Sequence, residues 1–179
     1  FYQLADHLAF GPIEEAHLSR WIDERMTASR VNARDVGRVI VVMAGPRTRD
    51  IVQVARQCFD NCRASGQATE ADVVQAFEDV VAEQESLLQT AWSGHTSQQQ
   101  NVLRAVAADR DGLTTRATHR QFGLSSSGST ANTAARLVDA GHLLKSSSRT
   151  GYSFESPFFR GWVERETFKD LGSLRPRST

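Results

Sequence analysis

The second half of the chain carries a hydrophobic pattern that allows few arrangements of helices and strands. Apolar residues recur at helical spacing in three consecutive segments, and two short apolar runs then flank a serine-rich loop that ends at Gly151. Pro157 suits the first turn of one more helix, where its missing N–H is not needed. The pattern predicts helices at residues 97–107, 115–122 and 130–140, strands at 143–145 and 152–154, and a last helix from 156 to about 168.

Three helices, a two-stranded wing and a closing helix are typical of a winged helix-turn-helix. Ser97 with Gln100 predicts a capping box at its first helix, Leu113 a short strand, and Gly141 the end of its third helix. We therefore predict a winged-helix domain over residues 95–170, followed by a loose tail at residues 171–179.

The first half of the chain predicts a helical bundle over residues 1–94. Its helices are expected at 12–30, 35–43, from Arg47 to about 64, and 69–92, the last as one long element capped by Thr69. Ile13, Trp21, Ile22 and Met26 form the expected apolar face of the first helix. Four β-branched residues leave a buried strand open as an alternative for 35–43. The predicted fold class is mainly α, a helical bundle followed by a winged helix with a small β-wing.

Composition restricts the class of protein. Apolar content of 40% and charged content of 23% are ordinary for soluble globular domains. No run approaches about 18 apolar residues, so no membrane span or membrane partner is expected. Two cysteines and no recognisable leader favour a cytoplasmic protein. The chain opens at Phe1 within an apolar pattern, which predicts a piece of a longer protein.

The zero net charge hides an asymmetry between the halves. Residues 1–94 hold 9 Lys+Arg and 14 Asp+Glu, whereas residues 95–179 hold 12 and 7. A basic second half is compatible with nucleic-acid binding, because neutralising phosphates supplies most non-specific affinity. A solvated surface explains five excess charges about as well.

The chain lacks the motifs of an independent active site. A P-loop needs a glycine–lysine pair, but the only lysines, Lys145 and Lys169, follow Leu144 and Phe168. Cys58 and Cys62 stand four apart on a predicted helix without a second pair, so we expect two buried thiols and no metal site. We predict no enzymatic activity, and no bound cofactor, for this stretch of chain alone.

Several strings resemble the C-terminal region of AAA+-type P-loop ATPases, in the branch related to archaeal-type and STAND ATPases. There a helical lid is followed by a winged helix. The resemblance covers about residues 1–168 and is carried by residues 1–13, 43–47, 101–107, 137–143 and 151–159. It implies an upstream P-loop core that binds ATP with Mg²⁺, and a lid that transmits the nucleotide state to the winged helix.

The resemblance also implies a role for Gly45, Pro46 and Arg47. Many AAA+ proteins place an arginine called sensor 2 at this helix start, where it reaches the γ-phosphate of ATP. A helix N-terminus and a guanidinium suit that task, since both attract phosphate oxygens. Arg47 is the expected residue and Arg49 a weaker candidate; the alternative is a surface arginine beside Asp50. The STAND pattern carries no obligatory arginine here, which leaves the branch open.

The winged helix predicts a surface for nucleic acid or for protein. In DNA-reading members the third helix enters the major groove and the wing reaches the backbone. One arginine on that helix makes strong base readout doubtful. Docking on a protein, or on the protein's own ATPase core, stays open as the alternative. The candidate contacts are hydroxyl, amide and cationic side chains: Ser127, Ser129, Thr130, Asn132, Arg136, Lys145 and Arg149.

Two other functions fit the pattern. One is a winged-helix transcription regulator in which residues 69–92 form a dimer seam, although Gln84 interrupts the apolar line that such a seam needs. The other is a protein–protein scaffold. The aromatic run Phe158, Phe159 and Trp162 is expected to pack back onto the fold, with a partner anchor as the alternative.

Overall fold

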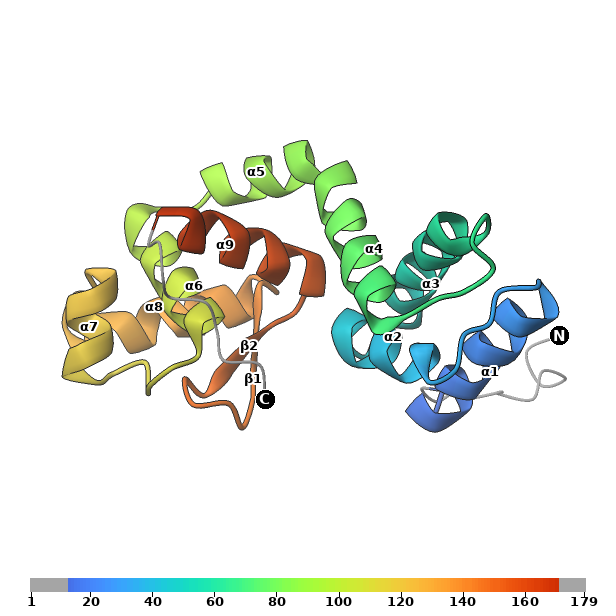
Figure 1. Ribbon diagram of the computed structural model, residues 1–179. Coiled ribbons are helices and arrows are strands. Elements are labelled where there is room, and N and C mark those ends of the chain that lie inside the picture. The colour runs from blue at the N-terminus through green and yellow to red at the C-terminus, as the bar shows by residue number, and fades with distance from the viewer. Residues whose placement is uncertain (1–12, 171–179) are drawn as a thin grey trace, which may run out of the picture. The chain divides into compact units, whose positions relative to one another are not determined.

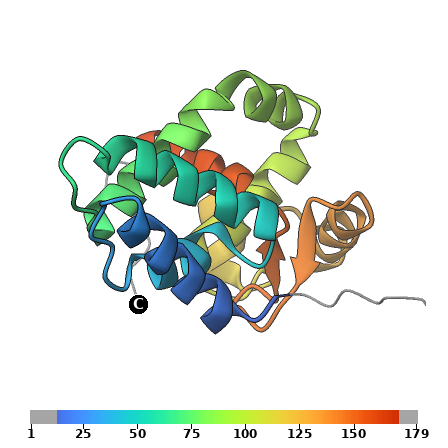
Figure 2. The same ribbon diagram turned by 90° about the vertical axis from the view of Figure 1, so that its right-hand side faces the viewer.

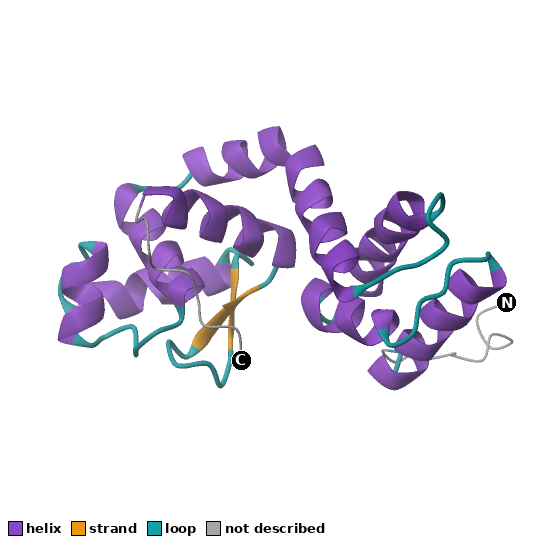
Figure 3. Ribbon diagram, in the orientation of Figure 1, coloured by secondary structure: helices purple, strands orange, loops and turns teal. Residues whose placement is uncertain are grey.

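The computed structural model describes residues 13–170. Over these residues the fold is mainly α: nine helices and one two-stranded antiparallel hairpin, which lies just before the last helix (Figures 1 and 3). Contacts divide the chain into two compact units, Phe1–Phe77 and Glu78–Thr179. The division falls within the helix Glu70–Glu83. The domain boundary at residue 94 stays a prediction. The expected tail at 171–179 and the segment before Ile13 lie outside the described residues.

The first unit confirms the predicted helices. Its second segment is a helix rather than a strand, and it packs against the helices before and after it (Figures 1 and 2). The loop after the first helix also contacts the loop after the third, because the backbone of Asn32 forms hydrogen bonds with Gly66 and Ala68, each at 2.9 Å. The elements are α1 (Glu15–Ala28), α2 (Val36–Ala44), α3 (Thr48–Cys62) and the start of α4 (Glu70–Glu83).

The buried stripe of α1 differs from the predicted one. Leu18, Ile22 and Met26 are buried, whereas Ile13 and Trp21 are exposed. Residues four apart lie on one helix face, so this spacing sets the stripe. Trp21 precedes Ile22 by one residue and points about 100° away from it. The prediction was therefore wrong at Ile13 and Trp21.

The N-terminus of α2 is capped from another helix. Asp35, its N-cap residue, adopts a left-handed conformation and makes no side-chain cap. Instead Oδ1 of Asp23, on α1, accepts a hydrogen bond from the backbone N–H of Gly37 at 2.7 Å. A carboxylate here satisfies a free N–H and suits the positive end of the helix.

The two cysteines behave as core residues. Both are buried on α3. Burial, and secondarily the neighbouring Cys62, raises the pKa of the Cys58 thiol to about 12. A protonated thiol is a poor metal ligand, since binding needs the thiolate. Within residues 13–170, no cluster of three or more His, Cys, Asp or Glu residues forms a site for a metal ion.

The long helix predicted at residues 69–92 is broken at Gln84. α4 ends at Glu83 and α5 spans Glu85–Ser93, with φ −92° and ψ 7° at Gln84. Neither proline nor glycine stands at the break, so no helix-breaking residue marks it. The turn buries Leu88 and leaves its neighbour Leu87 exposed. The straight seam that a dimeric regulator would use is interrupted here.

The second unit has the predicted order of elements, with shifted starts. Thr96 with Gln99 forms the capping box of α6, one residue before the predicted Ser97 and Gln100. The third helix begins at Ser127 rather than Thr130, because the Ser126 hydroxyl caps it. Leu113 lies in a turn, not a strand. The elements are α6 (Ser97–Ala108), α7 (Arg116–Phe122), α8 (Ser127–Asp139), β1 (Leu143–Lys145), β2 (Tyr152–Phe154) and α9 (Pro157–Asp170).

Aromatic side chains fill the core beside α9. Phe158, Phe159 and Trp162 are all buried, which confirms that this run packs back onto the fold. The rings of Phe159 and Trp162 stack at 6.4 Å between centroids. The ring of His142 lies edge-on to His95 at 4.5 Å. Burial, and then the neighbouring His95, lowers the pKa of His142.

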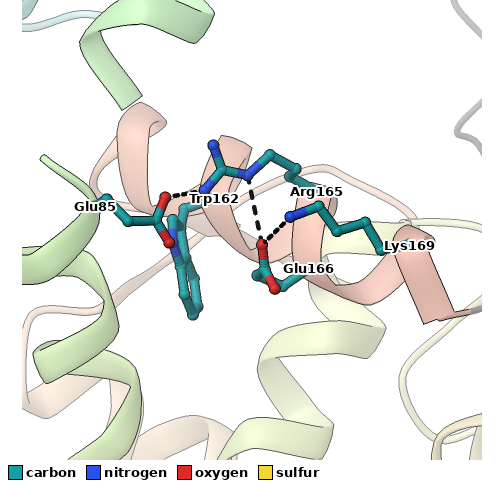
Figure 4. Close-up of polar contacts among 5 residues, drawn as sticks. All are labelled: Glu85, Trp162, Arg165, Glu166 and Lys169. Carbon is teal, nitrogen blue, oxygen red and sulfur yellow. Dashed lines mark hydrogen bonds and ion pairs between the residues drawn. The ribbon is translucent and has the colours of Figure 1, made fainter. Parts of the chain in front are cut away.

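Glu85 fastens α5 to α9. Its Oε1 accepts a hydrogen bond from the indole N–H of Trp162 at 2.8 Å, and its Oε2 pairs with the guanidinium of Arg165 (Figure 4). The hydrogen bond from Trp162, followed by Arg165, lowers the pKa of Glu85. Glu166 in turn pairs with Arg165 and Lys169. This anchor at the first residue of α5 gives a physical reason for the change of direction at Gln84.

Candidate nucleic-acid interface

The wing between β1 and β2 is internally bonded. The strands pair in the register Leu143 to Phe154 and Lys145 to Tyr152. Within the loop, the Ser148 hydroxyl donates to the Tyr152 carbonyl at 2.7 Å and accepts from the Ser146 hydroxyl at 3.0 Å. Such bonds within the loop hold it in one shape before any ligand binds.

Asp109 holds the wing from outside the hairpin. One carboxylate oxygen accepts from the Thr150 N–H at 3.0 Å and from its hydroxyl at 3.3 Å. The guanidinium of Arg149 donates to the Arg110 carbonyl at 3.2 Å. The wing is thus tied to the connection that follows α6, and Arg149 is kept at the surface.

Six of the seven predicted contact residues are exposed, and the seventh is not. Ser127, Ser129, Asn132 and Arg136 are all exposed on α8. Thr130 is 0% exposed. Each helical residue turns by about 100°, so Asn132 lies opposite Thr130. We correct the prediction for Thr130, which belongs to the core. Lys145 and Arg149 are exposed on the hairpin.

The wing and α8 border the same hollow. It has a volume of about 260 Å³ and is lined by Ala131 of α8, residues 148–152 of the wing, and residues 112–114. The outer side of α8 near it consists of small residues, Ser127, Gly128 and Ala131. Small side chains let another backbone approach the helix closely. The hollow therefore places Arg149 of the wing beside Ala131 of α8.

The predicted nucleotide-contacting residues lie in the first unit. Gly45 has a φ of +72°, and Arg47 is the N-cap residue of α3. The Arg47 side chain is half-buried and engaged in a contact. Asp50 is buried, and Arg49 donates to it at 3.0 Å while itself remaining exposed. This carboxylate lies in the first turn, where it offsets part of the positive potential of the helix start.

The structure adds two residues that the sequence did not single out. Asp109 and Thr150 orient the wing although they stand 41 positions apart. The sequence from Asp109 to Gly112 indicates a turn, but no local pattern identifies Thr150 as the hydrogen-bond partner of Asp109. Only the tertiary structure supplies it.

The chain has no match among protein families, curated proteins or solved structures. Among the described helices, none combines the length and the apolar content that crossing a lipid bilayer requires.

Proposed function

We propose that the second unit binds the backbone of double-stranded nucleic acid through α8 and the wing, with little dependence on sequence. The observation that carries the proposal is the hollow between the wing and Ala131 of α8. It is lined by Arg149 and by four residues with hydroxyl groups, Thr114, Ser148, Thr150 and Tyr152. Hydroxyls, amides and cations are the groups that contact phosphate and sugar.

The chemistry of α8 favours positioning over base readout. Asn132 is the one side chain on the centre of its outer face that forms bidentate contacts to a base edge. Arg136 stands one turn further along, and the neighbouring residues are small. Phosphate contacts then come from Arg136, Lys145 and Arg149, which is few for a sequence-specific reader.

Salt dependence of duplex binding tests this proposal. Three phosphate contacts give a slope of about −2.7 for log affinity against log salt, so affinity falls roughly 40-fold between 50 and 200 mM. The double variant Lys145→Ala with Arg149→Ala should leave a slope of about −0.9. The measurement is fluorescence anisotropy of a random-sequence DNA duplex titrated with the whole chain at several salt concentrations.

A matched control removes one arginine and one lysine elsewhere in this unit. Arg160 and Lys169 lie on α9, where each pairs with a glutamate. Arg160→Ala with Lys169→Ala should keep the slope of the unchanged chain. Equal slopes for both double variants, or no duplex binding at 50 mM salt, would contradict the proposal and favour a protein partner for this face.

We further propose that the chain is the C-terminal part of a P-loop ATPase, in which the first unit transmits the nucleotide state. The resemblance of residues 43–47 to the start of a lid helix supports this, together with the position of Arg47 at the N-terminus of α3. The proposal requires a glycine–lysine phosphate loop encoded upstream of Phe1. Sequencing the surrounding gene is the measurement, and a gene without that loop would end this half of the proposal.

A further inference from the structure

We infer that an apolar groove between α1 and α3 binds an acidic amphipathic segment of a partner protein. The groove lies within the first unit, which contains none of the residues assigned to nucleic acid. The inference does not rest on the proposed function.

The groove leaves two large apolar side chains partly exposed. Trp21 is 49% exposed and Val52 is 44% exposed, and both line it. The hollow has a volume of about 200 Å³. An apolar cavity of about 150 Å³ admits a benzene ring, so this one has room for a large apolar side chain. The apolar lining comes from two helices: Trp21, Ile22 and Met26 of α1, and Val52, Ala55 and Phe59 of α3.

The two charged side chains that line the groove are both cationic. Arg25 and Arg56 line it, whereas the acidic residues of α1, Glu15, Asp23 and Glu24, border other hollows of the unit. Arg56 pairs with Asp60 only at 3.8 Å, and both side chains are exposed, so solvent screens that pair. Within the described residues, Arg25 forms no ion pair.

Apolar lining with cations at the rim selects the chemistry of the occupant. An exposed tryptophan beside arginines is the composition of interface hot spots. A segment that inserts a leucine or an aromatic residue fills the hollow, and carboxylates on either side of that residue meet Arg25 and Arg56. An amphipathic helix presents this arrangement at a spacing of three or four residues.

Selection from a random peptide library displayed on phage, with the whole chain as bait, tests the inference. The expected result is enrichment of peptides with a leucine or aromatic residue flanked by Asp or Glu. The most enriched peptide is then synthesised with a fluorescent label, and its affinity is measured by anisotropy. Val52→Glu and Arg25→Glu should each weaken binding about tenfold or more.

Matched variants separate the groove from the rest of the surface. Val42 of α2 is 71% exposed and does not line the groove, and Arg20 of α1 lines a different hollow. Val42→Glu and Arg20→Glu should change the affinity less than about twofold. Far-UV circular dichroism checks that all four variants stay folded.

Three outcomes would overturn the inference. The library yields no enriched peptide, the enriched peptides lack acidic residues, or Val52→Glu binds as well as Val42→Glu. Sedimentation of the free chain tests the remaining alternative, in which a second copy of the chain occupies the groove. A dimer that Val52→Glu converts to a monomer assigns the groove to a second copy and refutes a partner segment.

Discussion

Replacing Gly37 with alanine should destabilise the first unit by about 3 kcal/mol or more. A Cβ at this position would lie 2.0 Å from the carbonyl oxygen of Ser19, a backbone atom of α1. Backbone cannot rotate away as a flexible side chain does, so α1 and α2 must separate. That separation also weakens the hydrogen bond from Gly37 to Asp23 and opens the packing around Ile22.

Chemical unfolding followed by amide hydrogen exchange of α1 and α2 measures the effect. Gly128→Ala is the matched control, because Gly128 also lies in a helix and a Cβ there meets nothing within 4 Å. Alanine exceeds glycine in helix propensity by about 0.5–1 kcal/mol, so this variant should be neutral or stabilising. Equal stability of Gly37→Ala and Gly128→Ala would contradict the close approach of α1 and α2.

Replacing Trp162 with alanine should destabilise the second unit by about 3–5 kcal/mol. Trp162 is 4% exposed and stacks on Phe159, with Trp92 a further ring neighbour at 5.8 Å. The variant leaves a cavity in this aromatic core. It also removes the indole donor that holds Glu85, so α5 loses one of its two anchors to α9 (Figure 4).

Hydrogen exchange of α5 and α9, together with urea unfolding, reports this loss. Trp162→Phe keeps a ring in the core and should lose less stability than Trp162→Ala. It still removes the hydrogen bond to Glu85. Trp21→Ala makes the same change at a half-exposed position of the first unit and should stay within about 1 kcal/mol of the unchanged chain. A loss of stability for Trp162→Ala no larger than that for Trp21→Ala would refute the role of Trp162 in the core.

The exposed residues of the candidate interface could be predicted from the sequence, whereas the contacts that hold the wing in place could not. Lys145, Arg149 and the serines of α8 were identifiable because a hairpin pattern follows three helical patterns in order. Thr130 was misplaced, since it was expected as the first residue of the helix. Ser126 caps the helix four residues earlier, so Thr130 lies within it. There it stands four residues before the buried Ala134 and on the same face. Asp109 was missed because its partner Thr150 is distant along the chain.

The sequence by itself determined which segments become helix or strand, through turns with glycine or serine, capping hydroxyls and apolar spacing. These signals suffice because local structure depends on neighbours within a few residues. Tertiary structure alone decided the bend at Gln84, the capping of α2 by Asp23 of α1 and the attachment of the wing to Asp109. Each of these depends on a contact between residues far apart in the chain: Glu85 with Trp162, Asp23 with Gly37, and Asp109 with Thr150. A hydrogen bond or a buried ring stabilises such an arrangement only after distant segments meet, so a local pattern carries no record of it.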